Sequence, residues 1–243
     1  MTNFLDFTEK NYKKLLYEIK VNFTIKDPLD IDFLSNECIW RHDVDVSPQR
    51  SLKLAQIENK LGIKTNYYLM LGCRFYTIFE KEILPIFKEI INLGHVIGLH
   101  FDPNLYNINN YRDFYYSLNS EKRMLENILN YKIHTYTLHN PTAIDFSPGF
   151  ESQFTGLKNV SSKEFVDKFK YCSDSNGIWR HDNLFELAQD KNIKSLYALT
   201  HPVWWVPHPL PPRERIKRAI NGRSQKTIND YDIDMKYFKR PNI

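Results

Sequence analysis

The chain has 243 residues, of which 42% are hydrophobic and 14% aromatic, a composition typical of a folded protein and not of a disordered one. Lys and Arg number 33 against 29 Asp and Glu, and the resulting charge of +4 is too small to indicate a nucleic-acid-binding protein. No run approaches about 18 apolar residues and no secretory signal pattern opens the chain, so we expect no transmembrane segment and a cytoplasmic location.

Short apolar strands alternate with helical stretches along the chain. An amphipathic helix containing Tyr12 and Ile19 opens it, and Ser47 followed by Pro48 marks the start of the next helix. The expected strands cover residues 37–43, 65–71, 95–100, 132–138, 169–173 and 193–200. The expected helices cover residues 48–61, 83–93, 120–129, 162–168 and 183–190. Strands separated by helices of about 10–15 residues are typical of βαβ units, so we expect an α/β fold with about seven parallel strands.

The expected elements follow one another without a flexible linker, which predicts a single domain over residues 1–243. Its core is expected over residues 37–210, followed by a basic peripheral tail over residues 211–243. The long connection from Phe146 to Ser161 is a candidate for a substrate-binding loop, because long loops in compact α/β domains are often lids or binding loops.

Asp43 and Asp45 lie at the carboxyl end of the first expected strand. Because side chains alternate along a strand, both carboxylates should share one face while Val44 points to the other. Two carboxylates so close repel each other unless a cation offsets the repulsion or one pKa rises. Ligands of parallel α/β folds bind beyond the carboxyl ends of the strands, so the pair is a candidate catalytic or metal site. A solvated turn before Ser47 is the alternative.

Three histidines, His100, His139 and His201, follow later strands at the same expected edge of the sheet. Carboxylate and imidazole groups together indicate one divalent metal ion used for hydrolysis. Zinc is favoured, and nickel, cobalt or iron are compatible with the same ligands. Trp204 and Trp205, just after His201, are candidates for lining a sugar pocket, with core packing as the alternative.

Three runs of sequence resemble the polysaccharide deacetylases, the NodB-homology or family 4 carbohydrate esterases. They are Arg-His-Asp-Val-Asp at 41–45, Gly-Ile-Lys-Thr-Asn-Tyr-Tyr at 62–68 and Gly-His-Val-Ile-Gly-Leu-His at 94–100, and the resemblance extends over roughly residues 39–205. It implies a distorted (β/α) barrel and a metal-dependent hydrolase that removes acetyl groups from N-acetylated sugars. The chain looks most like a bacterial subgroup of surface-glycan biosynthesis, whose partner is an N-acetylated sugar or glycan precursor.

The resemblance also implies roles for individual residues. Asp43 corresponds to the catalytic base and His201 to the general acid, while Asp45 and His100 correspond to metal ligands. The stretch 174–180 corresponds to an acidic, tryptophan-containing motif that supports the site. With Trp204 and Trp205, the residues expected to contact the substrate are Asp102 and Arg180.

The chain departs from the family pattern at three places. Val44 separates two aspartates that are usually adjacent, which leaves open which of them binds the metal. The second metal histidine is expected at the position of Asn104, and His139-Asn140-Pro141 replaces an arginine-proline motif. The simplest physical repair is that His139 supplies the missing imidazole, with Asp102 as the alternative ligand.

Two other functions remain open at the level of sequence. An Asp-x-Asp pair also occurs in cation-dependent nucleotide-sugar enzymes, although here it follows the first strand, too early for a preceding nucleotide-binding unit. A catalytically inactive glycan-binding relative would keep the fold without the missing metal histidine. In the deacetylase interpretation, a backbone N–H near Pro141 and Thr142 is expected to stabilise the oxyanion. The particular sugar and the oligomeric state are not indicated by the sequence.

Overall fold

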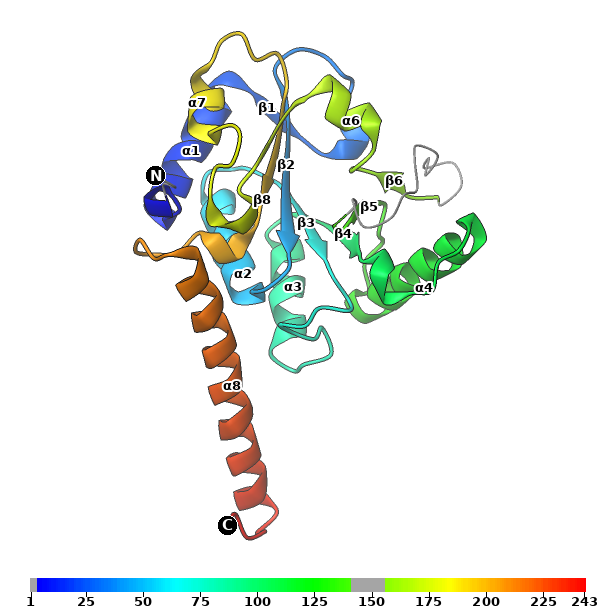
Figure 1. The fold of residues 1–243 in the computed structure, drawn as a ribbon, viewed down its shortest axis with the longest axis vertical. Helices are drawn as coiled ribbons and strands as arrows, with labels where there is room; N and C mark the ends of the chain where they lie inside the picture. The colour runs from blue at the N-terminus through cyan, green and yellow to red at the C-terminus, as the bar shows by residue number, and fades with distance from the viewer. Residues whose placement is uncertain (1–3, 141–155) are drawn as a thin grey trace.

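The computed structural model describes residues 4–140 and 156–243, and its centre is a curled parallel sheet (Figure 1). The strands are β1 (Thr24–Lys26), β2 (Glu37–Val44), β3 (Asn66–Leu69), β4 (Val96–Phe101), β5 (Thr135–Leu138), β6 (Lys158–Asn159), β7 (Lys170–Ser173) and β8 (Leu196–Thr200). Seven of them run in the order β6-β5-β4-β3-β2-β8-β7, and β1 pairs with the start of β2. All of these pairs are parallel. The sheet forms a half-barrel, which confirms the distorted (β/α) barrel expected from the sequence.

Helices cover the outer face of this half-barrel (Figure 1). They are α1 (Glu9–Asn22), α2 (Pro48–Lys60), α3 (Ile83–Asn92), α4 (Tyr111–Leu129) and α7 (Leu184–Gln189). Two further helices lie elsewhere: α6 (Lys163–Lys168) packs Phe165 into the cluster inside the half-barrel, and α8 (Pro212–Tyr237) follows the last strand. The side chain of Ser47 caps α2 by accepting a hydrogen bond from the backbone N–H of Arg50. Gly62, with φ of +66°, ends the same segment in a left-handed conformation that glycine adopts without strain.

The structure differs from the sequence expectations mainly at the ends of elements. Helix α4 begins at Tyr111 and not near residue 120, because Asn110 caps it by accepting bonds from two backbone N–H groups. Strands β1 and β6 are too short to leave a periodic pattern. The basic tail forms the long helix α8, which leaves the domain beside α2 and extends away from it (Figure 1). Within residues 4–140 and 156–243, no helix is both long and apolar enough to span a bilayer.

The two faces of β2 have different environments. Trp40 and Cys38 pack among the outer helices, whereas Ile39 belongs to a small cluster inside the half-barrel. Tyr68 and Tyr197 belong to that inner cluster as well. Residues 41, 43 and 45 continue the inward face of β2 above Ile39, because side chains alternate along a strand. The half-barrel therefore has an apolar floor and a polar mouth.

The outward face of β2 carries His42, which joins a fully buried polar network around Glu58 of α2. Glu58 accepts hydrogen bonds from the hydroxyls of Tyr12, Tyr67 and Thr65, the last two at 2.7 and 2.8 Å. His42 Nε2 lies 2.7 Å from the same carboxylate. Burial opposes its ionisation, yet His42, His95 and Tyr12 lower the pKa of Glu58 to about 2. An ionised carboxylate therefore fastens α2 to β2, β3 and α1.

Candidate metal centre and active site

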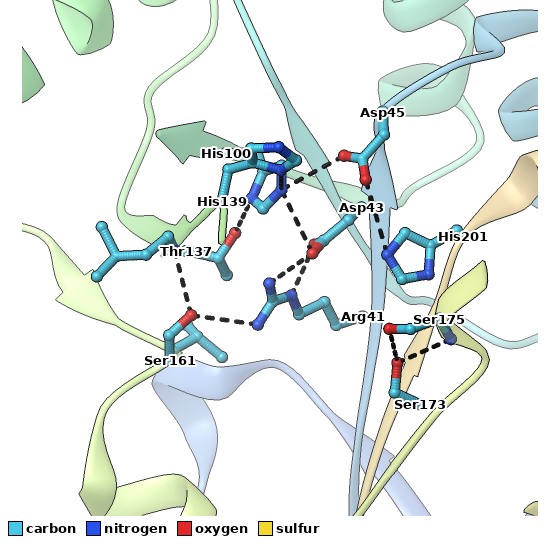
Figure 2. Close-up of polar contacts among 12 residues, drawn as sticks. Arg41, Asp43, Asp45, His100, Thr137, His139, Ser161, Ser173, Ser175 and His201 are labelled. Atoms are coloured by element: carbon cyan, nitrogen blue, oxygen red, sulfur yellow. Dashed lines mark hydrogen bonds and ion pairs between the residues drawn. The ribbon is translucent and has the colours of Figure 1, made fainter. Parts of the chain in front are cut away.

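The carboxyl ends of four strands surround a cavity of about 300 Å³. Asp43 and Asp45 come from the end of β2, His100 from β4, His139 from the residue after β5, and His201 from the residue after β8. All five residues line the cavity, and Figure 2 shows them facing one another. The structure thus brings together the aspartates and histidines that the sequence placed at separate strand ends.

Asp45, His100 and His139 form a compact set of potential metal ligands. One donor atom from each lies within 4.8 Å of the other two. His100 Nε2 is 3.3 Å from Asp45 Oδ1 and 3.2 Å from His139 Nδ1. Thr137 Oγ1 lies 2.7 Å from the other ring nitrogen of His100, so it orients Nε2 toward the cluster (Figure 2). This is the ligand chemistry of a divalent transition metal.

The environment of Asp45 tests whether a cation fits this set. Its Oδ1 is buried, and its one close contact among the described residues is His100 Nε2 at 3.3 Å, which is poorly directed for a hydrogen bond. Burial opposes ionisation, but His100, His201 and His139 hold the pKa of Asp45 below its ordinary value. An ionised, buried oxygen with so little compensation is costly, and a cation bound between Asp45 and the two imidazoles would satisfy it. The three residues therefore fit a metal ion.

The two alternatives for the missing metal histidine have different positions. His139 points its Nδ1 at His100, whereas Asp102 lies outside the three-residue cluster. Asp102 instead accepts hydrogen bonds from the backbone and side-chain N–H groups of Asn104, at 3.0 Å each. Asn104 is exposed and turned toward this cap. The geometry favours His139 as the third ligand.

Asp43 has a different set of partners from Asp45. Arg41, two residues earlier on the same strand face, holds both of its carboxylate oxygens, with Nε at 2.6 Å and a terminal nitrogen at 2.5 Å (Figure 2). The remaining terminal nitrogen of Arg41 donates to Tyr197 Oη at 2.9 Å and to Ser161 Oγ at 3.3 Å. Burial opposes ionisation of Asp43, but Arg41 and His100 keep its pKa low. Asp43 is therefore a fixed, ionised carboxylate.

His201 is held from behind by Asp174, a fully buried residue directly after β7. Asp174 Oδ1 is 2.6 Å from His201 Nδ1 and accepts the backbone N–H of His201 at 2.9 Å. Its other oxygen accepts a bond from Trp205 Nε1 at 2.9 Å. Burial favours the neutral imidazole, but Asp174 and the cavity aspartates raise the pKa of His201 to about 9. His201 Nε2 faces the cavity, 3.7 Å from Asp45 Oδ2.

The residues expected to contact the substrate do not line this cavity in the structure. Trp205 is 0% exposed and packs against Phe7 and Tyr12, so it serves the core. Trp204 is also buried and contacts the space beside Gly177. Neither Arg180, which is exposed, nor Asp102 is among the lining residues. Among the described residues, the lining side chains besides Arg41, the aspartates and the histidines are those of Leu138, Asn140, Ser161, Val166, Tyr171, Ser175, Tyr197 and Leu199.

Part of the expected substrate loop lies outside the described residues. The segment 141–155 contains the positions near Pro141 and Thr142 that were expected to stabilise the oxyanion, and most of the connection from Phe146 to Ser161. Ser161 itself is described, and its hydroxyl accepts hydrogen bonds from Arg41 and from the backbone N–H of Leu138. Through these two hydrogen bonds, Ser161 links the end of the 146–161 connection to β5 and to the Arg41 side chain.

Two residues received no role of their own in the sequence analysis, although both orient the site. Arg41 stands two residues before Asp43, and this spacing on a strand was the available signal. Asp174 was only one of several residues in the supporting stretch 174–180. Its contact with His201 joins residues 27 positions apart, which no local pattern reveals.

Of the comparisons with known proteins, only the one with solved structures finds proteins similar to this chain. No protein-family model matches the sequence, and no curated protein matches it. Its structural neighbours include carbohydrate esterases of family 4. A polysaccharide deacetylase from Bacillus cereus is 14% identical with a TM-score of 0.48, and the match covers 78% of this chain and 88% of that one. A family 4 carbohydrate esterase from Bacillus anthracis is 12% identical with a TM-score of 0.46, covering 87% and 86%.

A third neighbour is a family 4 pseudoenzyme from Bacillus anthracis, 16% identical with a TM-score of 0.47, and the match covers 78% of this chain. This chain spans 60% of the length of that protein. The family named by the sequence resemblance is thus also the family of these structural neighbours. At such low identity the likeness concerns the overall fold, and the function below rests on the side chains of this chain.

Proposed function

We propose that this protein is a metal-dependent hydrolase that removes an N-acetyl or related acyl group from a sugar in bacterial polysaccharide biosynthesis. One observation carries the proposal: three potential metal ligands, an arginine-held carboxylate and a carboxylate-held imidazole share one cavity. Amide hydrolysis needs an electrophilic centre, a base that activates water and an acid that protonates the leaving nitrogen. The cavity supplies a candidate for each.

Asp45, His100 and His139 would hold the metal ion. When bound, a divalent cation polarises a carbonyl oxygen and lowers the pKa of coordinated water. The three side chains come from strands β2 and β4 and from the end of β5, so the sheet fixes their relative positions. Thr137 sets the ring orientation of His100, and Asn140 Nδ2 lies 3.0 Å from His139 Nε2.

Asp43 acts as the general base in this proposal. It takes a proton from the attacking water as the water oxygen forms a bond with the acyl carbon. The Arg41 fork fixes the carboxylate plane on one side, while Asp43 Oδ2 remains 3.5 Å from His100 Nε2 on the cavity side. The base is thus positioned beside the place where the metal ligands converge.

His201 acts as the general acid. After water has added to the carbonyl, the bond between carbon and nitrogen breaks and His201 Nε2 gives its proton to the departing amine. Asp174 holds the opposite ring nitrogen, so it keeps Nε2 directed at the cavity. The products are a carboxylic acid and a free amino sugar. Because Asp43 and His201 have different environments, each is suited to one of the two proton transfers: Asp43 accepts a proton from water, and His201 donates one to the amine.

The experiment measures acetate release from N-acetylglucosamine, its oligomers and nucleotide-linked N-acetylglucosamine by the metal-loaded protein. We expect turnover of at least one of these, and a loss of about 10²–10⁴-fold in Asp43→Asn, since a general base contributes that much. The bound metal per protein should be the same in the variant and the wild type. Undiminished turnover in Asp43→Asn would contradict the role given to this residue.

Two outcomes would favour a different function. Tight, metal-dependent binding of a nucleoside diphosphate without acetate release would favour a cation-dependent nucleotide-sugar enzyme. Glycan binding by protein that takes up no stoichiometric metal would favour an inactive relative. Metal content and acetate release, measured on the same preparation, separate these from deacetylation.

A further inference from the structure

A second cavity, of about 270 Å³, lies between α8 and the segments that follow β2 and β8. Val46 and Ser47, directly after Asp45, line it on one side, and Val203, two residues after His201, lines it on another. The two cavities therefore flank the same two segments of chain. We call this second cavity the basic groove.

Five cationic side chains line the basic groove, against one carboxylate, Glu80. They are Arg50, Arg215, Arg218, Arg223 and Lys226. Glu80 is fully engaged, because Arg223 holds its two oxygens at 2.5 and 3.1 Å. Arg50 pairs with Glu9 at 2.8 Å, and Lys226 pairs with Asp230, so these two charges are also offset. Among the described residues, Arg215 and Arg218 form no ion pair, and they leave the groove with an excess of positive charge.

Arg215 adds a buried positive charge to this wall. It is 2% exposed, and its two terminal nitrogens donate to the backbone carbonyls of Trp204 and Phe4, at 2.5 and 2.9 Å. Its Nε has no hydrogen-bond partner in the described part of the chain. Burial lowers the pKa of Arg215 to about 10, which leaves the guanidinium charged at neutral pH. Among the described residues, no carboxylate forms an ion pair with the Arg215 guanidinium.

Arg50 and the amino-terminal end of α2 add to the positive electrostatic potential in the basic groove. Burial lowers the pKa of Arg50, and its ion pair with Glu9 only partly offsets this, while the nearby charge of Arg218 lowers the pKa as well. Ser47, Pro48 and Gln49 line the groove with the amino-terminal end of this 13-residue helix, which carries a partial positive charge. A negatively charged ligand would relieve the repulsion among these groups.

We propose that the basic groove binds the phosphate or diphosphate group of a ligand. Guanidinium groups present paired N–H donors that match phosphate oxygens, and several arginines around one small cavity suit a multiply charged oxyanion. The proposal concerns binding outside the reaction cavity, so it holds or fails independently of the deacetylase proposal.

The test measures binding of inorganic pyrophosphate to the full-length protein by isothermal titration calorimetry. The variants are Arg218→Ala, the matched control Lys217→Ala, and Asp45→Asn. Lys217 is the exposed neighbour of Arg218 and does not line the groove. We expect the wild type to bind, Arg218→Ala to lose about tenfold in affinity, and the other two variants to match the wild type. Loss of binding in Asp45→Asn would place the anion in the reaction cavity and overturn the proposal.

Vesicles with and without phosphatidylglycerol distinguish a lipid headgroup from a soluble phosphate ester. Binding of pyrophosphate alone, weakened by Arg218→Ala, assigns a soluble phosphorylated ligand. Binding of the anionic vesicles, weakened by Arg218→Ala and not by Lys217→Ala, assigns a lipid-linked phosphate. The proposal is wrong if neither pyrophosphate nor the vesicles bind the wild type. It is also wrong if Lys217→Ala and Arg218→Ala weaken binding equally.

Discussion

Asp43 and Asp45 have identical side chains on one face of one strand, yet the groups that contact the two carboxylates differ. Arg41 occupies both oxygens of Asp43, whereas Asp45 faces the imidazole rings of His100 and His201. This difference in neighbours supports the proposed roles, with Asp43 as the proton acceptor and Asp45 as a metal ligand. The same principle applies to His201, whose role depends on Asp174 behind it.

Replacing Asp174 by Asn is expected to impair turnover without removing the substrate site. An amide cannot offer His201 Nδ1 the charged acceptor that it has now, so the ring loses both orientation and stabilisation of its protonated form. We expect kcat to fall by about 10²–10⁴-fold with little change in KM. Steady-state kinetics of acetate release measures this.

Asp182→Asn is the matched control for this substitution, because Asp182 forms only a partly exposed ion pair with Lys170 at 2.8 Å. It should keep the wild-type kcat. If Asp174→Asn raised KM and left kcat unchanged, Asp174 would act in substrate binding and not through His201.

At the scale of elements, β2 links the candidate site to the packing of the helices. Its inward face carries Arg41 and Asp43 into the cavity, and its outward face carries His42 to Glu58 of α2. The buried carboxylate of Glu58 also takes bonds from side chains of α1 and β3. The strand that positions Asp43, the proposed base, is therefore held in place by a polar network on its other side.

Glu58→Gln should destabilise the protein by about 3 kcal/mol, because the amide leaves buried donors without their charged acceptor. Chemical unfolding in urea measures the change. Glu89→Gln, an exposed position on α3, is the control and should change the free energy of unfolding by less than about 0.5 kcal/mol. Equal stability of the two variants would show that the network contributes little.

The same residue predicts how stability depends on pH. The folded state lowers the pKa of Glu58 from 4.5 to about 2, so the unfolded chain binds the proton first as pH falls. Its stabilising contribution is complete above pH 4.5 and is lost as the pH approaches 2. We expect the free energy of unfolding of the wild type to fall more steeply over this window than that of Glu58→Gln. Parallel curves would contradict the assignment.

Gly98 of β4 shows how closely the strands inside the half-barrel are packed. A Cβ there would lie 2.3 Å from Cε1 of Tyr68 and 2.9 Å from Thr135 Oγ1, and the Tyr68 side chain is fully buried. Gly98→Ala should therefore destabilise the protein by about 1–3 kcal/mol. Gly222→Ala, on α8 with nothing within 4 Å, should instead stabilise its helix by up to about 1 kcal/mol. Thermal unfolding of both variants tests the opposite signs.

At the scale of the whole molecule, parallel pairing brings every strand's carboxyl end to one edge of the sheet. Residues as distant in sequence as Asp43 and His201 meet there because β2 pairs with β8, with Arg41 opposite Leu199. The edge combines a reaction cavity with the basic groove on the other side of the segments after β2 and β8. One edge thus offers two chemically distinct surfaces.

A metal ion that binds only the folded protein should raise its melting temperature. At a free concentration of 100 times the dissociation constant, the added stability is about 2.7 kcal/mol. We expect zinc, nickel or cobalt to raise the melting temperature of the wild type and of His181→Ala, which changes an exposed histidine outside the cluster. His100→Ala should show no such increase, and an equal increase in all three proteins would place the metal elsewhere.

Residue patterns were enough to predict the alternation of strands and helices, the parallel α/β class and the positions of the polar residues at strand ends. Apolar periodicity and capping residues act over a few neighbours, so Tyr12, Ser47 and Gly62 predicted local structure correctly. The same locality explains why the short strands β1 and β6 and the start of α4 were missed.

Which side chains meet depends on the tertiary structure. It placed His139 and not Asp102 beside Asp45, buried Trp205 in the core, and joined Asp174 to His201. These outcomes depend on strand order, on the curl of the sheet and on contacts between residues far apart in the chain. Such contacts arise from pairing and packing across the molecule, and local sequence patterns do not encode them.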